Sequence, residues 1–422
     1  MEREVIAIAF FKQMFNSARW EDRFGAIQGS LAFIQQQGTK SATILEYMWS
    51  YIIRDRFTKL LVDDEFRVRN QTAALLKIVV ASDQAGRGLA HFDELKDKLL
   101  ENIQQTFKRD ISGDASTGAL KDKSIRPLIK PDQDSGKTMH DTEGWKSLET
   151  SMRNLQHLIE AIGTHLYAFE LSQILEVIEK ANAHLNRFVR EIAYFVINAI
   201  FETSVGVQKT EHYPNFVSFC EKLVPLIQSG LSDNWSQVRY ASSLCCRSFY
   251  AAVADDNTLQ ELYNGMLVPR MCLNRYYVAE GVRVYSNDTW KHVFGEKGKT
   301  MVCQYADQVA DFYISQSQAD NHAVREAACH CISELCTKVA GVDEASKEPF
   351  RKHIEKLLET LVDCFKDESW PVRDAACIAC GAFVATFPEE SQPKYEELCK
   401  IWIDHLSDNI FSVRMHSAAA LA

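Results

Sequence analysis

Two fragments of the sequence carry the residue types of a phosphate-binding loop. Gly-Lys-Thr stands at 136–138 and again at 298–300, and in nucleotide-binding loops a lysine and a hydroxyl after such a glycine contact the phosphates and their metal ion. The loop also needs a glycine five residues earlier, so that backbone amides can surround the phosphates. Those places hold Pro131 and Val293, and no strand is expected before either fragment. The sequence therefore predicts no nucleotide and no other cofactor.

Several cysteines and one histidine in the C-terminal half have spacings that suit a metal. Cys377 and Cys380 form a CxxC pair, and His330 lies between Cys329 and Cys331. A zinc site needs four converging ligands, which two such pairs joined by a loop usually supply. Here the cysteines alternate with alanine and isoleucine in segments expected to be helical, where residues three apart share one face. We interpret them as core residues and predict no metal.

No group of residues favours catalysis. His157 and His165 lie eight residues apart in an amphipathic segment, and scattered histidines of this kind are ordinarily surface or core residues. The sequence has no HExxH motif and no nucleophile elbow. We predict that the protein is not an enzyme and takes no small-molecule substrate.

Charge and apolar patterning argue against two further classes of protein, those that bind nucleic acid and those that span a membrane. The formal net charge is −10 and the pI about 5.7, and lysine and arginine do not cluster, so we predict no nucleic-acid partner. No stretch reaches 18 apolar residues, so we predict no membrane span. All 12 cysteines lie at or after Cys220, mostly in apolar helical segments. This favours a reducing compartment, the cytoplasm or alternatively the nucleus.

A recurring phrase predicts the elements that hold all these residues. A polar or acidic start is followed by Val-Arg and small residues, as at 232–241 and 367–376. The anchoring arginines are Arg23, Arg69, Arg190, Arg239, Arg283, Arg325, Arg373 and Arg414. They lie 41 to 49 residues apart, except for a gap of 121 that becomes two repeats of 42 once the 37 residues of 110–146 are removed. This period predicts an all-α superhelical solenoid of about nine helix pairs.

Each pair is expected to consist of an A helix, a short turn and a B helix that opens with Val-Arg. Residues 1–109 hold repeats 1 and 2 and the first helix of repeat 3, near 92–109. The polar stretch 110–146 is expected to be a flexible loop inserted in repeat 3. Residues 147–422 hold the second helix of repeat 3, near 147–164, and repeats 4–9. The final B helix lacks a polar end, so we expect the solenoid to continue beyond residue 422.

The repeated residues resemble the HEAT repeat family, whose helix pairs carry an aspartate near the turn and Val-Arg early in helix B. The resemblance implies that aspartates and arginines of neighbouring repeats form a structural ladder. The implied ladder residues are Asp233 with Arg239, Asp367 with Arg373, Asp408 with Arg414, and Arg325. Repeats 1, 4 and 6 depart from the pattern, since Arg190 and Arg283, for example, have no aspartate six residues before them.

Large aromatic residues recur at the turns before the B helices. They are Trp20, Phe66, Trp235, Trp370 and Phe411. Two interpretations stay open: packing against the next repeat, or contact with a partner, since aromatics are over-represented in binding hot spots. The segment 18–27 is also similar to the first-repeat turn of TOG domains, which are HEAT arrays that hold tubulin.

The sequence therefore predicts a non-enzymatic scaffold or adaptor that binds protein partners through the solenoid surface. One alternative is a TOG-like array that binds tubulin or microtubules. Acidic residues in the later turns, such as Asp233 and Asp367, argue against it because tubulin is acidic too. A second alternative is a transport-receptor-like protein that binds cargo.

Overall fold

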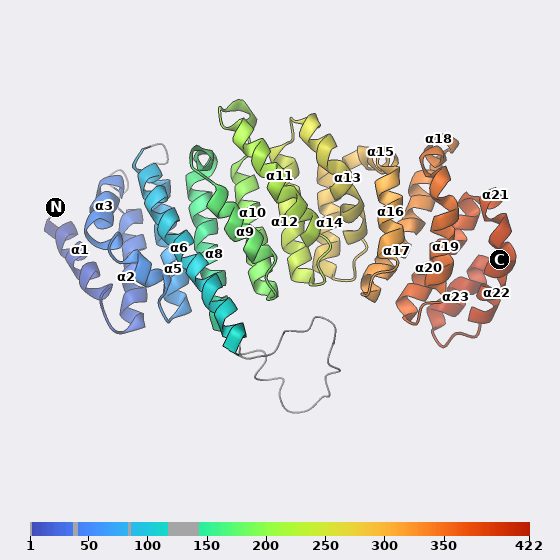
Figure 1. Ribbon diagram of the computed structural model, residues 1–422, viewed down its shortest axis with the longest axis horizontal. Coiled ribbons are helices and arrows are strands. Elements are labelled where there is room, and N and C mark those ends of the chain that lie inside the picture. Colours follow the sequence, from blue (N-terminus) through green and yellow to red (C-terminus); the bar gives the residue numbers. More distant parts are fainter. Residues whose placement is uncertain (1, 37–40, 83–85, 117–142) are drawn as a thin grey trace. The chain divides into compact units, whose positions relative to one another are not determined.

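The computed structural model describes residues 2–36, 41–82, 86–116 and 143–422 (Figure 1). Every regular element in these ranges is a helix, and none of them contains a strand. The predicted all-α class is therefore confirmed. The chain divides into two compact units, Met1–Leu223 and Val224–Ala422, which are described separately below.

The first unit is a succession of helices joined by short turns. They are α1 Glu2–Met14, α2 Trp20–Gln36, α3 Ser41–Met48, α4 Phe57–Leu61, α5 Phe66–Ala81, α6 Arg87–Ser116, α8 Glu143–Ile162, α9 Ser172–Asn182, α10 Arg187–Thr203 and the first part of α11 Tyr213–Gly230. A π-helical turn, Trp49–Ile53, connects α3 to α4. The B helices α2, α5, α8 and α10 pack one on the next, and this layer holds much of the core.

The second unit begins within α11 and continues in the same manner. Its helices are α12 Ser236–Ala252, α13 Asn257–Asn274, α14 Glu280–Val293, α15 Gly298–Gln304, α16 Ala306–Gln316, α17 His322–Glu334, α18 Glu344–Lys347, α19 Ile354–Phe365, α20 Trp370–Thr386, α21 Pro388–Ser391, α22 Tyr395–His405 and α23 Phe411–Leu421. The B helices α17, α20 and α23 pack on one another, as do the A helices α13, α16 and α19. Each unit is thus built as a solenoid of two helical layers.

The pair α19 and α20 shows why the sequence folds in this way. The apolar residues of α19 recur at steps of three and four, so they form one stripe, and Ile354, Leu357, Leu361 and Phe365 are all buried. Pro371 stands in the first turn of α20, where a helix loses no backbone hydrogen bond. The next chain reversal follows Thr386 and is marked by Pro388.

The third repeat differs from the prediction at its boundaries. α6 runs on to Ser116 and α8 begins at Glu143, so both ends of the predicted loop 110–146 are helical. The prediction used polar composition, which reports that a segment is not buried. A helix satisfies its backbone hydrogen bonds internally and can therefore extend past its last packed residue. The rest of the predicted loop, 117–142, lies outside the described residues.

Candidate partner-binding edge

The recurring arginines close the A–B turns from inside. Arg325 donates from Nη1 to the carbonyl oxygens of Ala319 (2.8 Å) and Asp320 (3.0 Å). Arg373 does the same with Asp367 and Glu368, at 2.9 Å each. These carbonyls belong to turn residues beyond the ends of α16 and α19, where no helical hydrogen bond satisfies them. The arginine five or six residues later donates to them, which explains why its position repeats.

The aspartates of the turn have two partners each. The carboxylate of Asp367 accepts a hydrogen bond from the Ser369 amide (2.8 Å), as a residue that starts a helix does. The same carboxylate receives both Nε and Nη2 of Arg325 from the preceding repeat, at 2.7 and 2.9 Å. Arg373 reaches Asp408 in the same way, at 3.2 and 3.5 Å.

The ladder therefore exists, but its pairing differs from the one that the resemblance implied. Within one repeat, Arg239, Arg373 and Arg414 contact the main-chain carbonyls of Asp233, Asp367 and Asp408. The side-chain pairs that are seen join neighbouring repeats instead, as in Arg325–Asp367. The reason is that the aspartate carboxylate is turned toward the start of its own B helix, where it faces the arginine of the repeat before.

The hydrogen bonds of the ladder stabilise the ionised forms of Arg325 and Asp367. The hydrogen bond to Asp367 raises the pKa of Arg325. Burial acts to raise the pKa of Asp367, but the hydrogen bonds from Arg325 and the Ser369 amide outweigh it, and that pKa is lowered. Both residues therefore stay ionised at neutral pH, and their charges are paired with each other.

One rung uses an amide in place of a carboxylate. Arg239 is almost fully buried, at 1% exposure, and donates from Nη1 to Asn274 Oδ1 (2.7 Å) and to the Leu231 carbonyl (2.9 Å). Its guanidinium lies 4.2 Å from the centre of the Tyr277 ring. Burial lowers the pKa of Arg239, and the ring and the carbonyls stabilise the charge that remains.

Repeat 6 departs further, because its anchoring arginine is not part of the ladder. Arg283 is exposed. Arg275 is held instead, with Nη2 2.7 Å from Glu334 Oε1 and its guanidinium 4.9 Å from the Trp290 ring centre. The sequence period placed the repeat correctly and chose the wrong arginine, since the turn before α14 lacks the aspartate of the other turns.

Two anchoring arginines of the first unit, Arg23 and Arg69, differ in their contacts. Arg23 binds Asp63 at 2.6 and 2.8 Å. Arg69 donates from Nη1 to the carbonyls of Asp63 (2.5 Å) and Asp64 (3.1 Å), but its buried Nε has no hydrogen-bond partner among the described residues. The following repeat is the one that contains 117–142.

The turn aromatics face solvent in the second unit. Exposed fractions are 46% for Trp235, 48% for Trp370 and 70% for Phe411. In the first unit Phe66 is 53% exposed, whereas Trp20 is half-buried beneath the Arg67 guanidinium, 5.2 Å from its ring centre. Of the two open interpretations, the exposure of Trp370 and Phe411 favours contact with a partner.

Carboxylates accompany these aromatics along the A–B turns of the second unit, which lie at its lower edge in Figure 1. They are the exposed residues Glu280, Asp320, Asp363, Glu368 and Asp404. None of the five has an ion-pair partner in the described part of the chain. Lys366, the lysine of these turns, is bound to Glu397 at 2.9 Å. The sequence prediction missed these acids because it looked for aspartates six residues before an arginine.

A hollow of about 180 Å³ lies at the same edge, where α16 and α19 end. Its lining residues are Ser317, Gln318, Thr360, Asp363, Cys364 and Asp367. We call the turn regions 231–236, 275–280, 317–322, 366–370 and 404–411, with this hollow, the acidic edge.

The residues considered for metal and nucleotide chemistry lie elsewhere. Cys377 and Cys380 are fully buried in α20, and Cys329 and Cys331 in α17. No three of the histidine, cysteine, aspartate and glutamate side chains in the described ranges are grouped as metal ligands would be. The fragment 298–300 begins α15, with Gly298 packed against Trp290.

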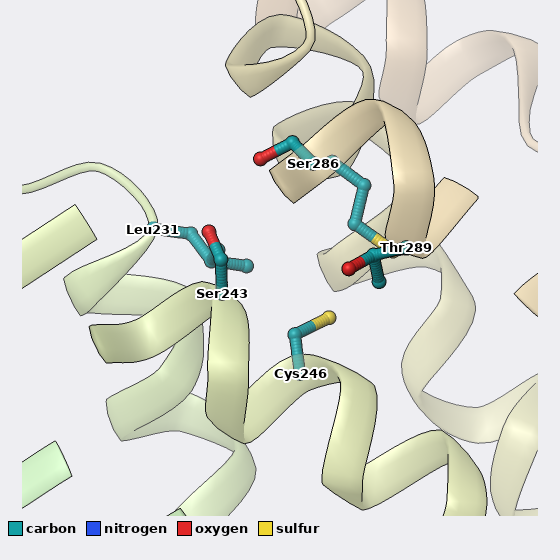
Figure 2. Close-up of a pocket in the computed structure, with 6 residues that line it drawn as sticks. Leu231, Ser243, Cys246, Ser286 and Thr289 are labelled. Carbon is teal, nitrogen blue, oxygen red and sulfur yellow. The ribbon is translucent and has the colours of Figure 1, made fainter. Parts of the chain in front are cut away.

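An internal cavity between α12 and α14 is too small for a cofactor. Its volume is about 10 Å³, roughly the room of one water molecule. Figure 2 shows Leu231, Ser243, Cys246, Ser286 and Thr289 around it. We found no helix in the described part of the chain that is both long and apolar enough to cross a membrane.

Comparison with protein families identifies the repeated unit. The family model for the HEAT repeat matches residues 357–387, which comprise most of α19, the turn and α20. The resemblance inferred from the sequence is thereby confirmed, and this helix pair is a HEAT repeat. No curated protein matches the chain.

Several solved structures match nearly the whole of this chain. Yeast importin-β (Kap95p) matches at 11% identity and a TM-score of 0.45, over 100% of this chain and 48% of that one. Kap121p bound to RanGTP matches at 12% identity and a TM-score of 0.45, over 98% of this chain and 42% of that one. Importin-β in a polyethylene glycol condition matches at 14% identity and a TM-score of 0.43, over 100% of this chain and 49% of that one. The chain spans less than half of each.

Proposed function

We propose that this chain is a non-enzymatic scaffold that binds protein partners through the acidic edge of its second unit. The observation that carries the proposal is the set of aromatic side chains exposed at the beginnings of three B helices, Trp235, Trp370 and Phe411. Trp370 and Phe411 stand in consecutive turns, and aromatic residues are over-represented in binding hot spots. Tryptophan is also among the residues that contribute most to binding energy.

The geometry of the turns supports a role outside the fold for these aromatics. Arginine side chains close the turns, and the Arg325–Asp367 and Arg373–Asp408 pairs join neighbouring repeats. The aromatic position takes part in neither task. A large apolar side chain there gains less from burial than a core residue does, which favours a partner as its second contact.

The acidic edge disfavours the tubulin-binding alternative, because an acidic partner would be repelled by carboxylates such as Asp320 and Glu368. Binding of a cargo protein, as in the transport-receptor alternative, is compatible with the proposal and differs from it in the identity of the partner. We propose the cytoplasm, or the nucleus, as the site of action. Support comes from ten of the twelve cysteines, which are buried within the helical packing as free thiols.

The test is a comparison of two triple variants of the full chain. Trp235→Ala, Trp370→Ala and Phe411→Ala together remove the aromatics of the edge. Leu262→Ala, Met266→Ala and Val342→Ala remove exposed apolar side chains of the same unit that lie away from its A–B turns. Partners captured from cells by the wild-type chain and identified by mass spectrometry should be lost from the first variant and kept by the second. A folded first variant that retains every partner would refute the proposal.

A further inference from the structure

We propose that the partner presents to the acidic edge an extended, basic segment that carries an apolar side chain about every third residue. This inference rests on the proposed function, since it names the chemistry of the partner that the same edge binds. It is carried by the free charges, the spacing of the turns and the hollow beside α19.

Within the turns that form the edge, the charges without an ion-pair partner in the described ranges are carboxylates, while the exposed Arg283 follows in the first turn of α14. The ladder arginines Arg325, Arg373 and Arg239 are directed inward and donate to carbonyls, to Asp367, to Asp408 or to Asn274. The same bonds neutralise the two ladder aspartates. What remains toward solvent is the set of five carboxylates that have no ion-pair partner in the described ranges. A partner with lysine or arginine opposite them is favoured, and an acidic one is rejected.

Aromatic rings beside carboxylates strengthen this preference. Trp370 is 48% exposed and follows Glu368 by two residues. A lysine or arginine side chain can lie over such a ring while its charged end meets the acid. The protein uses the same contact internally, where Arg239 lies over Tyr277 and Arg247 lies over Tyr285.

The spacing of the turns fits an extended chain. Neighbouring packed helices lie roughly 8–10 Å apart, and an extended peptide advances about 3.3 Å per residue. One repeat therefore corresponds to about three residues of a partner that runs along the edge. Exposed apolar side chains stand in consecutive turns at Trp370 and Phe411, so apolar residues three apart in the partner would meet both.

The hollow at the ends of α16 and α19 has room for one long basic side chain. Its volume of about 180 Å³ is well above the roughly 10–15 Å³ that a single water needs. Asp363 and Asp367 line it, and the C-terminal ends of two helices, which carry partial negative charge, border it. Asp367 is already bound to Arg325, so Asp363 is the carboxylate available to an incoming cation.

Three labelled fifteen-residue peptides test the inference with the full chain. The first consists of five Lys-Leu-Ser triplets, the second of five Glu-Leu-Ser triplets and the third of five Lys-Ser-Ser triplets. In fluorescence anisotropy the first peptide should bind most tightly, at least about tenfold tighter than the other two, and its affinity should fall as salt is added.

Two matched variants locate the binding. Asp320→Asn, Asp363→Asn and Glu368→Gln together should weaken binding of the Lys-Leu-Ser peptide about tenfold. Asp255→Asn, Glu296→Gln and Glu355→Gln remove three exposed acids of the same unit outside the A–B turns and should leave it unchanged.

The outcomes separate the inference from the proposed function. Equal or tighter binding of the Glu-Leu-Ser peptide, lost in the Trp370→Ala variant, would overturn the basic partner and leave the edge as a binding site. Failure of the Lys-Leu-Ser peptide to bind, or equal weakening by both acid variants, would overturn the inference as well. In each case the capture experiment with the aromatic variants still decides the proposed function.

Discussion

The two units share the arginine–aspartate pair between neighbouring repeats but differ in how regularly it recurs. In the second unit it joins Arg325 with Asp367 and Arg373 with Asp408. In the first unit it joins Arg23 with Asp63, but Arg69 has no carboxylate contact in the described ranges. There α5 and α8 are joined nearer their far ends by Lys77 and Glu160, 2.5 Å apart.

The turns of the two units also present different surfaces. Exposed arginines of the first unit lie beside acids, with Arg19 and Arg67 each 3.7 Å from a glutamate, and Arg67 covers Trp20. At the turns of the second unit, Arg239, Arg325 and Arg373 are directed inward, Arg283 is exposed, and five exposed acids have no ion-pair partner in the described ranges. The difference teaches that one repeated arginine position can serve the fold in both units while only the remaining charges decide what the surface attracts.

Among substitutions of charged residues, the largest effect on stability is expected from breaking the ladder in the second unit. Arg325→Ala removes two bonds to a nearly buried carboxylate and two to turn carbonyls, so it should lower the free energy of unfolding by about 2 kcal/mol. Lys356→Ala, at an exposed residue, is the control and should change it by less than about 0.5 kcal/mol. Equal shifts in a denaturant series would contradict a structural role for the ladder.

In the first unit, Glu160 pairs with Lys77 of the preceding repeat. Breaking this pair should lower the free energy of unfolding by less than breaking the ladder does. His157, Lys77 and Gln156 donate to this carboxylate. Burial acts to raise its pKa, but these bonds outweigh burial and bring the pKa to about 2. Glu160→Gln should cost about 1 kcal/mol at pH 7, because solvent reaches one side of the group and screens the interaction.

The pH dependence of that cost follows from the depressed pKa. The stabilisation by Glu160 is complete above the pKa of an unfolded glutamate, about 4.3. It is lost as the pH falls toward the folded value of about 2. The difference in unfolding free energy between wild type and Glu160→Gln should therefore shrink from pH 5 to pH 2. A constant difference over this range would show that the carboxylate charge is not the cause.

The sequence predicted the helix pairs and their period, but it did not predict the arginine partners or the unpaired acids at the surface. Helix pairs, their period and most of the arginine positions follow from local patterns, because every repeat buries the same kind of apolar face against its neighbours. The partner of each arginine depends on the stacking between repeats, which is why Asp367 was paired with Arg373 and not with Arg325. Acids without an ion-pair partner in the described ranges, such as Asp363 and Glu368, can be told from paired ones only when the ion pairs of the structure are known.

A small effect on stability is expected from the exposed aromatic residue of the second unit. Phe411 is 70% exposed, so Phe411→Ala should change the unfolding free energy by less than about 0.5 kcal/mol. Phe365, which is fully buried in the same unit, is the contrast, and Phe365→Ala should cost about 3–5 kcal/mol. A loss of stability at Phe411 comparable with that at Phe365 would assign the residue to the core and remove it from the acidic edge.

The smallest effect distinguishes the two arginines of repeat 6. Arg283 keeps the sequence period but is exposed, whereas Arg275 binds Glu334 and lies over Trp290. Arg283→Ala should leave the unfolding midpoint unchanged, while Arg275→Ala should lower it, because Glu334 would lose its buried partner. If Arg283→Ala lowered the unfolding midpoint more than Arg275→Ala, the arginine at the repeat period would be the stabilising residue, and the prediction would be wrong. The expected result means instead that a repeat can lose its ladder arginine when another guanidinium takes over the contact between neighbouring helices.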